Sequence, residues 1–462
     1  MKKILIILIV VVFALSLGLS ASACKAETAQ TTEEETTAAA TEAEATEAET
    51  TEAAAEATVV LKFTDWQGGN EAILKSYGEL EEIFKQDHPE VKDIEYTQYT
   101  VTTYNEFLKP AISGGTAPDL FAVYPGPDLA EVVDAGALRA LKADIDDEWK
   151  GWLGPAYDFK GMWYNDDIYI VAQDVWTECV WYHKDMLTEI GVELPASTDA
   201  FTVPELIAMV GPATEKGYDL FQAGFIETWS YYDAFFNFVH QQQPGETPDM
   251  VEQAFAGEIS WQQDIFRNAM QVFVDLNEAG AWPEDALNQD YQVQAFGKWL
   301  EKESIFMWGQ GDWFAGSMKE EENSKDNPNI GIVQYPLASE TAEVAFNKNF
   351  GTDIGVYAEG PNQDLAVAWI KLTNSPTAAN IFIKNGVNPA GGVDVANMPE
   401  VTNPVLEECI KLYNSPGKYS EVYYFYPDGV KALGDGIGNV VLGLDTIDNV
   451  LKQLDEVSGF QG

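Results

Sequence analysis

The chain alternates between short apolar runs and segments whose apolar residues recur every three or four positions. The apolar runs are rich in β-forming residues and predict strands, whereas the three-to-four spacing predicts amphipathic helices. The expected strands cover 59–64, 94–98 and 120–123, and the expected helices between them cover 73–84 and 104–111. This strand–helix–strand–helix–strand order predicts a parallel sheet with right-handed crossovers.

The rest of the chain mixes the same two periodicities. Helical spacing dominates between about 175 and 340, where aromatic residues are frequent. Residues 350–357 predict another strand, 362–372 a helix, and 376–386 a helix that begins on a proline and ends at a glycine. Residues 429–458 predict amphipathic helix interrupted by glycines. The whole pattern indicates an α/β fold.

The first residues have the pattern of a secretory signal. Two lysines precede an almost wholly apolar run over 4–19, which is shorter than the roughly 20 residues that a membrane-spanning helix needs. Small residues then lead into Cys24, so residues 1–23 are expected to be a signal peptide. A cysteine directly after the cut can carry a lipid such as palmitate. Bacterial lipoproteins usually have leucine where Ala21 stands, so ordinary secretory cleavage remains an alternative.

Residues 24–57 consist mostly of Thr, Glu and Ala, without an aromatic or a branched aliphatic side chain. Such a segment buries too little apolar surface to offset its ordering entropy, so it is expected to be disordered. Its ends would lie on the order of 30 Å apart as a flexible coil, and charge repulsion would extend it further. Behind a lipidated Cys24, it would act as a tether that holds the folded part at the outer face of the cell membrane.

Size and charge limit what the folded part does. The residues after 57 are too many for a single hydrophobic core, so two lobes are expected. The net charge of −49 argues against nucleic acid as a partner, because nucleic-acid binding needs basic patches. The charge also disfavours anionic ligands, which leaves neutral and cationic ones.

Cysteine and histidine give no sign of a metal or a cofactor. Beyond Cys24 the cysteines are Cys179 and Cys409, which either pair as a disulfide or remain as buried free thiols. The three histidines are scattered without the spacing of metal ligands. No bound metal and no cofactor are therefore expected.

Five motifs occur in an order that is familiar from one family. The chain resembles the extracellular solute-binding proteins of bacterial ABC importers, specifically the carbohydrate-type cluster (family 1) that includes maltose-binding protein. The matching segments are Phe84 to Val91, Gly114 to Val123, Val180 to Leu187, Met307 to Trp313 and Ala366 to Ala390. They span nearly the whole chain after Thr58. His183 and Asp312 depart from the residues usual in the family, which affects the substrate more than the fold.

This resemblance implies a two-lobed periplasmic-binding-protein-like fold. Each lobe would be a mainly parallel sheet flanked by helices, with a hinge between the lobes and one ligand in the cleft. On this basis lobe 1 is expected to comprise 58–174 and 341–390, and lobe 2 to comprise 175–340 and 391–462.

The resemblance also implies the function and the partners. The protein would capture a neutral sugar or oligosaccharide and deliver it to an ABC transporter, without being an enzyme. The permease subunits and the ATPase would be separate chains, and contact with the membrane would be through the lipid anchor only.

The expected ligand-binding residues follow from the chemistry of a sugar ring. Flat aromatic side chains suit its apolar C–H faces, and carboxyl and amide groups suit the hydroxyls at its rim. Tryptophan in loops beside acids and amides therefore points to binding, and the carboxyl ends of parallel strands are where ligands bind in such sheets. The candidates are Asp65, Trp66, Gln67, Tyr124, Asp174, Trp176, Trp229, Gln310, Asp312, Trp313 and Asp353.

The strongest candidate is Trp313, which follows two glycines that would let the backbone approach a ligand closely. It also matches a contact aromatic of the family. Packing explains some of the others almost as well: Trp66 as a lobe cap, Trp176 as a hinge residue and Trp229 as part of a helix core.

Two other functions remain open from the residues alone. Aromatics beside acids would also suit a cationic ligand such as a polyamine. A glycoside-active enzyme would need two carboxylates, and acids are so abundant here that no pair identifies a catalytic site. The chain lacks a nucleophile elbow, a P-loop, an HExxH metal motif and a dinucleotide fingerprint, so an enzyme is the weaker alternative.

Overall fold

The computed structural model describes residues 57–243, 249–319, 321–339, 341–345, 347–393, 400–413, 418–419 and 426–462. The predicted signal peptide, Cys24 and the tether up to residue 56 lie outside the described residues. The fold below is that of the unit Ala55–Gly462.

In the described part of the chain, ten strands form one sheet, and β4 and β5 form a separate pair. The order along the sheet is β2-β1-β3-β11-β6-β10-β7, with β12 beside β11, and with β9 between β6 and β8. The strands are β1 (Val59–Asp65), β2 (Val91–Gln98), β3 (Leu120–Ala122), β4 (Trp163–Tyr164), β5 (Asp167–Ile168), β6 (Ile170–His183), β7 (Ala200–Thr202), β8 (Asp219–Gln222), β9 (Ser304–Gly311), β10 (Ile330–Leu337), β11 (Asn347–Val356) and β12 (Lys418–Tyr419).

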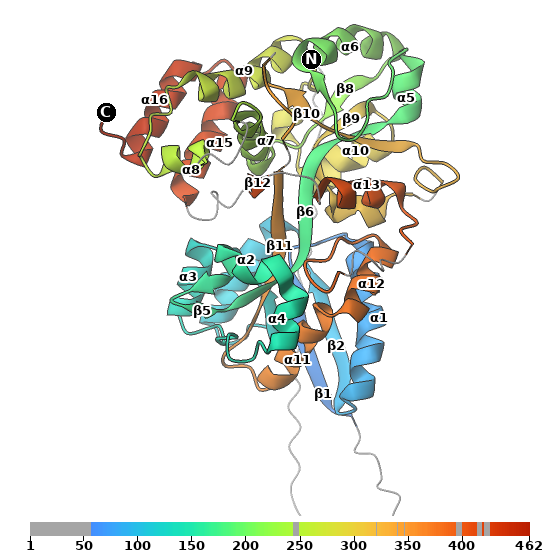
Figure 1. The fold of residues 1–462 in the computed structure, drawn as a ribbon, viewed down its shortest axis with the longest axis vertical. Helices are drawn as coiled ribbons and strands as arrows, with labels where there is room; N and C mark the ends of the chain where they lie inside the picture. Colours follow the sequence, from blue (N-terminus) through green and yellow to red (C-terminus); the bar gives the residue numbers. More distant parts are fainter. Residues whose placement is uncertain are drawn as a thin grey trace, which may run out of the picture. The chain divides into compact units, whose positions relative to one another are not determined.

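Two long strands connect the halves of this sheet. β1 pairs in parallel with β2 and β3 in one half, and β9 pairs in parallel with β8 in the other. The antiparallel pairs of this sheet all include β6 or β11, which also pair with each other. In Figure 1 these two strands run from the group of elements around β1 to the group around β9. Each half is therefore a partly parallel sheet, and the chain crosses between the halves on β6 and again on β11.

Helices cover both halves of the sheet (Figure 1). The α-helices are α1 (Glu71–Asp87), α2 (Val101–Ser113), α3 (Pro127–Asp134), α4 (Asp147–Leu153), α5 (Lys184–Glu189), α6 (Val203–Lys216), α7 (Trp229–Gln241), α8 (Met250–Phe255), α9 (Asp264–Glu278), α10 (Phe296–Leu300), α11 (Gln363–Thr373), α12 (Pro376–Asn385), α13 (Pro404–Tyr413), α15 (Pro427–Val441) and α16 (Ile447–Ser458). Shorter helical turns are η1 (Gly154–Asp158), η2 (Lys160–Met162), η3 (Ala286–Asn288), η4 (Tyr291–Ala295) and η5 (Asp312–Ser317).

The local signals in the sequence begin and end these helices as expected. The side chain of Asn70 accepts a hydrogen bond from the backbone N–H of Ile73 and so caps α1. Pro376 is the first residue of α12, and Gly386 ends it in the left-handed conformation with φ of 98°. The glycine-interrupted segment near the C-terminus forms two helices, α15 and α16.

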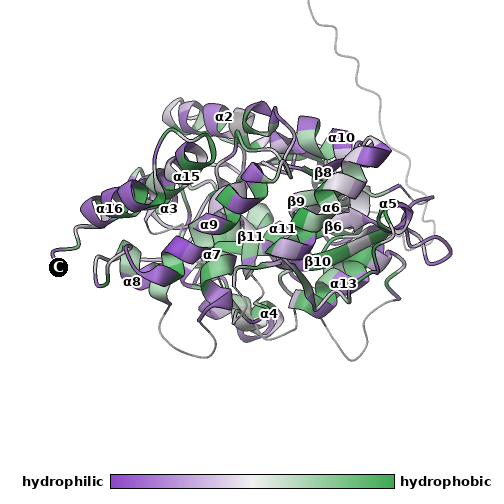
Figure 2. Ribbon diagram, turned by 90° about the horizontal axis from the view of Figure 1, so that it is seen from above, coloured by the Kyte–Doolittle hydropathy of each residue, from purple (hydrophilic) through white to green (hydrophobic). Residues whose placement is uncertain are grey.

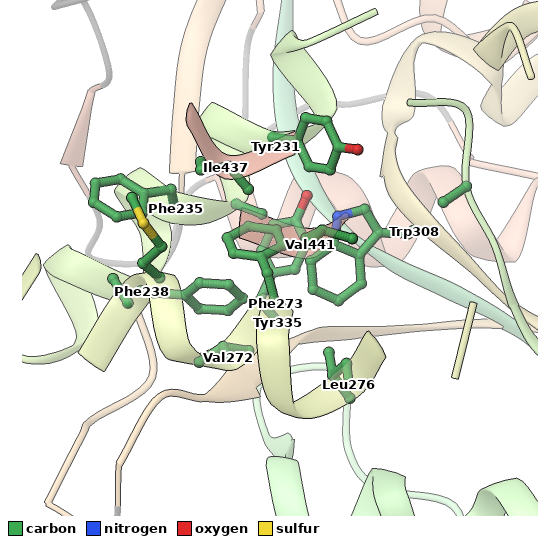
Figure 3. Close-up of a cluster of buried hydrophobic side chains, with 14 of the residues drawn as sticks. Tyr231, Phe235, Phe238, Val272, Phe273, Leu276, Trp308, Tyr335, Ile437 and Val441 are labelled. Carbon is green, nitrogen blue, oxygen red and sulfur yellow. The ribbon is translucent and has the colours of Figure 1, made fainter. Parts of the chain in front are cut away.

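Separate hydrophobic cores lie on the two sides of the crossing strands. The first core combines side chains from 61–175 with others from 350–387. The second lies among α7, α9, β9 and α15; Figure 3 shows part of it, with Phe238, Phe273, Trp308 and Tyr335 packed together. A third, smaller core joins η4, β9 and α13. Hydrophilic residues lie on outer helices such as α16, and hydrophobic ones on the inner strands (Figure 2). The predicted two-lobed α/β fold is confirmed.

Both cysteines of the folded part are free and buried. Cys179 lies on β6 and Cys409 on α13, and both belong to the third core. Burial raises the pKa of each thiol well above its ordinary value, which makes both sulfurs poor nucleophiles.

Candidate functional site

A cavity of about 530 Å³ lies between the first core and the other two. Trp66 and Tyr124 line it from the first core. Tyr232 lines it from the second core, and Trp229 and Trp313 line it from the third. Its size falls within the range of about 300–1,000 Å³ that is typical of small-molecule sites. Each side of the cavity is thus built by a different part of the chain.

A hydrogen-bonded network of polar side chains forms one wall of the cavity and joins the segment after β1 to β6 and β11. The Nε2 atom of Gln67 donates to Oδ2 of Asp174 at 3.0 Å and to Oγ1 of Thr352 at 2.8 Å. The Oε1 atom of Gln67 accepts from Nδ2 of Asn70 at 2.9 Å, and Asn70 also donates to the backbone oxygen of Trp313 at 2.7 Å. Gln67 is therefore occupied by its neighbours and positions Asp174.

Asp174 is an acidic group of this wall that the protein satisfies only in part. It is 8% exposed and lines the cavity, and its Oδ1 atom has no hydrogen-bond partner. Burial, with a smaller contribution from the charge of Asp65, raises the pKa of the Asp174 carboxyl to about 7. A ligand group that donates a hydrogen bond would satisfy Oδ1.

On the first-core side, two aromatic rings present a flat surface. The rings of Trp66 and Tyr124 stack with centroids 4.0 Å apart and planes 8° apart. Tyr104 meets Trp66 edge-on and fixes it from behind. Trp66 follows β1 and Tyr124 follows β3, at the carboxyl ends of neighbouring parallel strands, as the sequence predicts.

On the opposite side, three aromatic rings meet the ring of Trp313 edge to face. Its ring centroid lies 6.0 Å from that of Trp176, 5.9 Å from that of Trp229 and 6.5 Å from that of Tyr291. All four residues line the cavity. The two sides together offer the apolar surfaces that the faces of a sugar ring require.

Two predicted site residues lie behind the wall instead of on it. Asp65 is completely buried, accepts from the hydroxyl of Tyr96 at 2.7 Å, and has its pKa raised by burial to about 7. Asp353 is 1% exposed, and burial raises its pKa well above the ordinary value. Neither lines the cavity. The charge of Asp65 raises the pKa of Asp174, and the charge of Asp174 raises that of Asp353.

Gln310 and Asp312 also lie behind the aromatic side rather than on the cavity surface. Asp312 accepts from Nδ2 of Asn388 at 2.8 Å and from the backbone N–H of Thr177 at 3.3 Å, and burial raises its pKa to about 8. Gln310 accepts a hydrogen bond from the Tyr291 hydroxyl. Both side chains hold elements of the site in place.

The cavity wall is acidic. Asp128, Asp174, Glu227 and Asp233 line it, and none of the described residues that line it is a lysine, arginine or histidine. Oδ1 of Asp128 lies 3.7 Å from Nζ of Lys109, a residue that does not line the cavity. Glu227 accepts from a backbone N–H at 3.0 Å. An anionic ligand would meet carboxyl groups here without a cation to pair with.

Sequence reasoning did not select several residues of the wall. Tyr232 and Asp233 lie in the first turns of α7, where the neighbouring Tyr231 is buried in the second core. Tyr291 begins a π-helical turn, a feature that is frequent at functional sites. Thr352 stands beside the selected Asp353. The helical phase of α7 could have separated Tyr232 from Tyr231, but nothing in the sequence indicates the π-helical turn.

The described residues contain neither a metal-ligand cluster nor a membrane-spanning helix. No group of three or more His, Cys, Asp or Glu side chains there is arranged to hold a metal ion. Within the same ranges, no helix combines the length and the apolar character that a membrane span requires.

Comparison with known families gives a match over most of the chain. Residues 44–380 match the family described as bacterial extracellular solute-binding protein. No curated protein sequence matches the chain.

Solved structures with the same fold include several sugar receptors. A protein described under xylan utilization by Caldanaerobius polysaccharolyticus has a TM-score of 0.70 and 20% identity, covering 86% of this chain and 99% of that one. The GacH receptor of Streptomyces glaucescens, studied with acarbose, has a TM-score of 0.69 and 21% identity, covering 86% and 96%. Maltose-bound T. maritima MalE3 has a TM-score of 0.69 and 18% identity, covering 87% and 100%.

Proposed function

Because the chain belongs to the family of bacterial extracellular solute-binding proteins, we propose that it captures a neutral sugar or oligosaccharide and delivers it to an ABC permease. Members of this family bind solutes and are not enzymes, and the same holds for this chain. The ligand would occupy the cavity between the two lobes, and the permease and the ATPase would be separate chains.

The observation that carries the proposal is the composition of the cavity. Stacked Trp66 and Tyr124 face it from one side, and Trp176, Trp229 and Trp313 from the other. A buried polar network forms the wall between them. Aromatic faces combined with hydrogen-bonding groups at their edges match the mixed apolar and hydroxylated surface of a pyranose.

The solved structures of this fold support a saccharide over other solutes. Those described above are associated by name with xylan, acarbose and maltose, and another is a complex with raffinose. The acidic wall without a cation supports a neutral saccharide over an acidic one.

The first and second cores support the lobe boundaries expected from the sequence, whereas the third joins Ile383 of the expected lobe 1 to residues of lobe 2. The first core draws on the ranges assigned to lobe 1, namely 58–174 and 341–390, apart from Val175 at the boundary. The second core draws on 180–335 and 430–454, which belong to lobe 2. Closure of the lobes on a ligand would then bend β6 and β11.

The proposal includes anchoring by lipid. Residues 1–23 would be removed as a signal peptide, Cys24 would carry the lipid, and residues up to 57 would form the tether. The protein would then act at the extracellular face of the membrane, where the family functions.

A thermal-shift screen tests the proposal directly. The chain without residues 1–23 would be heated with maltotriose, xylotriose, raffinose, chitobiose and, as a cationic probe, spermidine. A sugar at a hundred times its dissociation constant should stabilise the protein by about 2.7 kcal/mol, which gives a readable shift. Calorimetric titration then provides the affinity.

The outcomes separate the alternatives. Stabilisation by a saccharide and not by spermidine supports the proposal. A response to spermidine alone would replace it with binding of a cationic ligand. Turnover of a glycoside by the purified protein would contradict the assignment as a binding protein.

A further inference from the structure

The two carboxylate oxygens of Asp174 have different surroundings. Oδ2 accepts from Nε2 of Gln67 at 3.0 Å and from Oγ1 of Thr352 at 3.3 Å. Oδ1 is buried without a hydrogen-bond partner, although Asp174 lines the cavity. The protein therefore fixes one oxygen and leaves the other for a ligand.

A glycine makes room beside this oxygen. Gly351 on β11 lies directly opposite Asp174 on β6 and also lines the cavity. A Cβ atom at Gly351 would stand 2.9 Å from Oδ1 of Asp174 and 2.9 Å from Cδ1 of Trp176. Gly351 has no positive φ, so its backbone conformation does not itself require glycine. The missing side chain leaves a recess next to the unpaired oxygen.

The same recess is bordered by a hydrogen-bond donor. The position of the absent Cβ lies 3.4 Å from Nε1 of Trp176. An acceptor, Oδ1 of Asp174, and a donor, the indole N–H of Trp176, thus both border the part of the cavity beside Gly351. A hydroxyl is the group that can donate to the first and accept from the second at once.

We propose that Asp174, Gly351 and Trp176 form a specificity subsite that takes one unsubstituted hydroxyl of the bound saccharide. The inference rests on the proposed function and adds which sugars are selected. A sugar with an ether or a carboxylate at that position would leave Oδ1 buried without a donor and would be rejected.

The groups around the subsite are acids and a phenol, and they provide no positive charge for an acidic sugar. Asp65 from β1, Asp353 from β11 and Asp312 from η5 interact with Asp174 electrostatically, and the Tyr77 phenol of α1 lies in the same field. None of these groups is a cation. A carboxylate in the recess would face Asp174 without a compensating positive charge.

Because two hydrogen bonds fix Oδ2, Asp174→Asn tests whether the ligand needs a hydrogen-bond acceptor in the recess. Gln67 and Thr352 both donate toward Oδ2, so the amide oxygen of the asparagine must take that place. Its NH₂ group then points into the recess, which changes from an acceptor to a donor. The substitution keeps the shape of the side chain and reverses what the recess accepts.

The experiment uses whichever of maltotriose, xylotriose and raffinose binds the chain most tightly, with its set of mono-O-methyl ethers and monodeoxy derivatives. Calorimetric titration should identify one hydroxyl whose removal or methylation weakens binding to the wild type about ten- to a hundredfold. Asp174→Asn should bind the methyl ether at that position with nearly the same affinity as the parent sugar. Gly351→Ala should weaken binding of the parent sugar, because the added methyl fills the recess.

Two matched variants control for general effects. Asp435→Asn removes an exposed carboxyl that pairs with Lys431 and does not line the cavity, so it should keep the discrimination among hydroxyls. Gly78→Ala adds a methyl where no atom lies within 4 Å, so it should leave binding unchanged.

Each result decides a separate point. If no saccharide of the thermal-shift screen binds the wild type, the proposed function fails and the subsite fails with it. If a sugar binds but no single hydroxyl matters, or Asp174→Asn discriminates as the wild type does, the subsite alone is wrong. If Gly351→Ala binds the parent sugar normally while folding normally, the recess is not where the hydroxyl lies.

Discussion

The indole of Trp313 lies directly over the backbone of Gly311. A Cβ atom at position 311 would stand 2.1 Å from Cζ3 of the Trp313 ring, far inside van der Waals contact. The glycine is therefore what lets the ring fold back against its own chain and meet Trp176 and Trp229 edge-on. The position of the central aromatic of the cavity depends on the absence of a side chain two residues earlier.

Gly311→Ala should consequently displace Trp313 and weaken binding of the best saccharide. The ring cannot keep its place beside a methyl group at that distance, so the edge-to-face contacts around it should be lost. We expect at least about a tenfold loss of affinity, by calorimetric titration. Gly297→Ala, where no atom lies within 4 Å, is the matched control. Unchanged affinity in Gly311→Ala would show that the ring does not need its present position.

Trp313→Ala should weaken binding more than it destabilises the fold. Loss of stacking and of buried apolar area should cost about 1–3 kcal/mol of binding free energy, roughly fivefold to 150-fold in affinity. Trp369, 1% exposed within the first core, provides the contrast, since its replacement by alanine should cost about 3–5 kcal/mol of unfolding free energy. Calorimetry and urea unfolding of both variants measure the two effects. Normal binding by Trp313→Ala, together with a loss of stability equal to that of Trp369→Ala, would make Trp313 a packing residue.

Cys24→Ala should abolish membrane attachment. Without a thiol there is no site for the lipid, so the precursor should accumulate uncut or the protein should be released into the medium. Fractionation of expressing cells, with mass spectrometry of the wild-type N-terminus, measures this. Wild-type protein that is soluble in culture fluid and begins with an unmodified Cys24 would rule out the anchor.

Much of the architecture could be predicted from the sequence because its signals are local. The cap at Asn70 and the stop at Gly386 depend on residues within one helical turn, and both lie where the pattern places them. The sequence also allows the prediction that Trp66 and Tyr124 lie at the same edge, because both follow strands of one parallel sheet; in the structure their rings stack.

The division of the acids between the wall and the interior could not be predicted in the same way. Asp174 and Asp353 both belong to strands at the crossing, yet only Asp174 lines the cavity. Which carboxyl reaches the surface depends on how β6 and β11 pair, a contact between residues far apart in the sequence. The recess at Gly351 has the same origin, because it exists only once β11 lies beside Asp174.

The buried acids predict that the ligand-free protein loses stability as pH rises through neutrality. The pKa of Asp65 is raised from 3.8 to about 7, so the folded state binds a proton there that the unfolded state releases above about pH 4. The stabilising contribution is complete below pH 4 and declines from there until pH exceeds 7. Asp174, with a pKa of about 7, and Asp312, with a pKa of about 8, act in the same direction. The slope should be on the order of 1 kcal/mol per pH unit for each such group.

Urea unfolding between pH 5 and 8 measures this slope. The variant Asp65→Asn shows how much of the slope is due to Asp65. The amide of that variant can still accept from the backbone N–H of Gln67 and can donate to the Tyr96 hydroxyl, so the local hydrogen bonds survive while the titrating group is gone. The unfolding free energy of Asp65→Asn should therefore fall less steeply with pH than that of the wild type. Parallel pH profiles for the two proteins would mean that Asp65 ionises in the folded state as readily as in water.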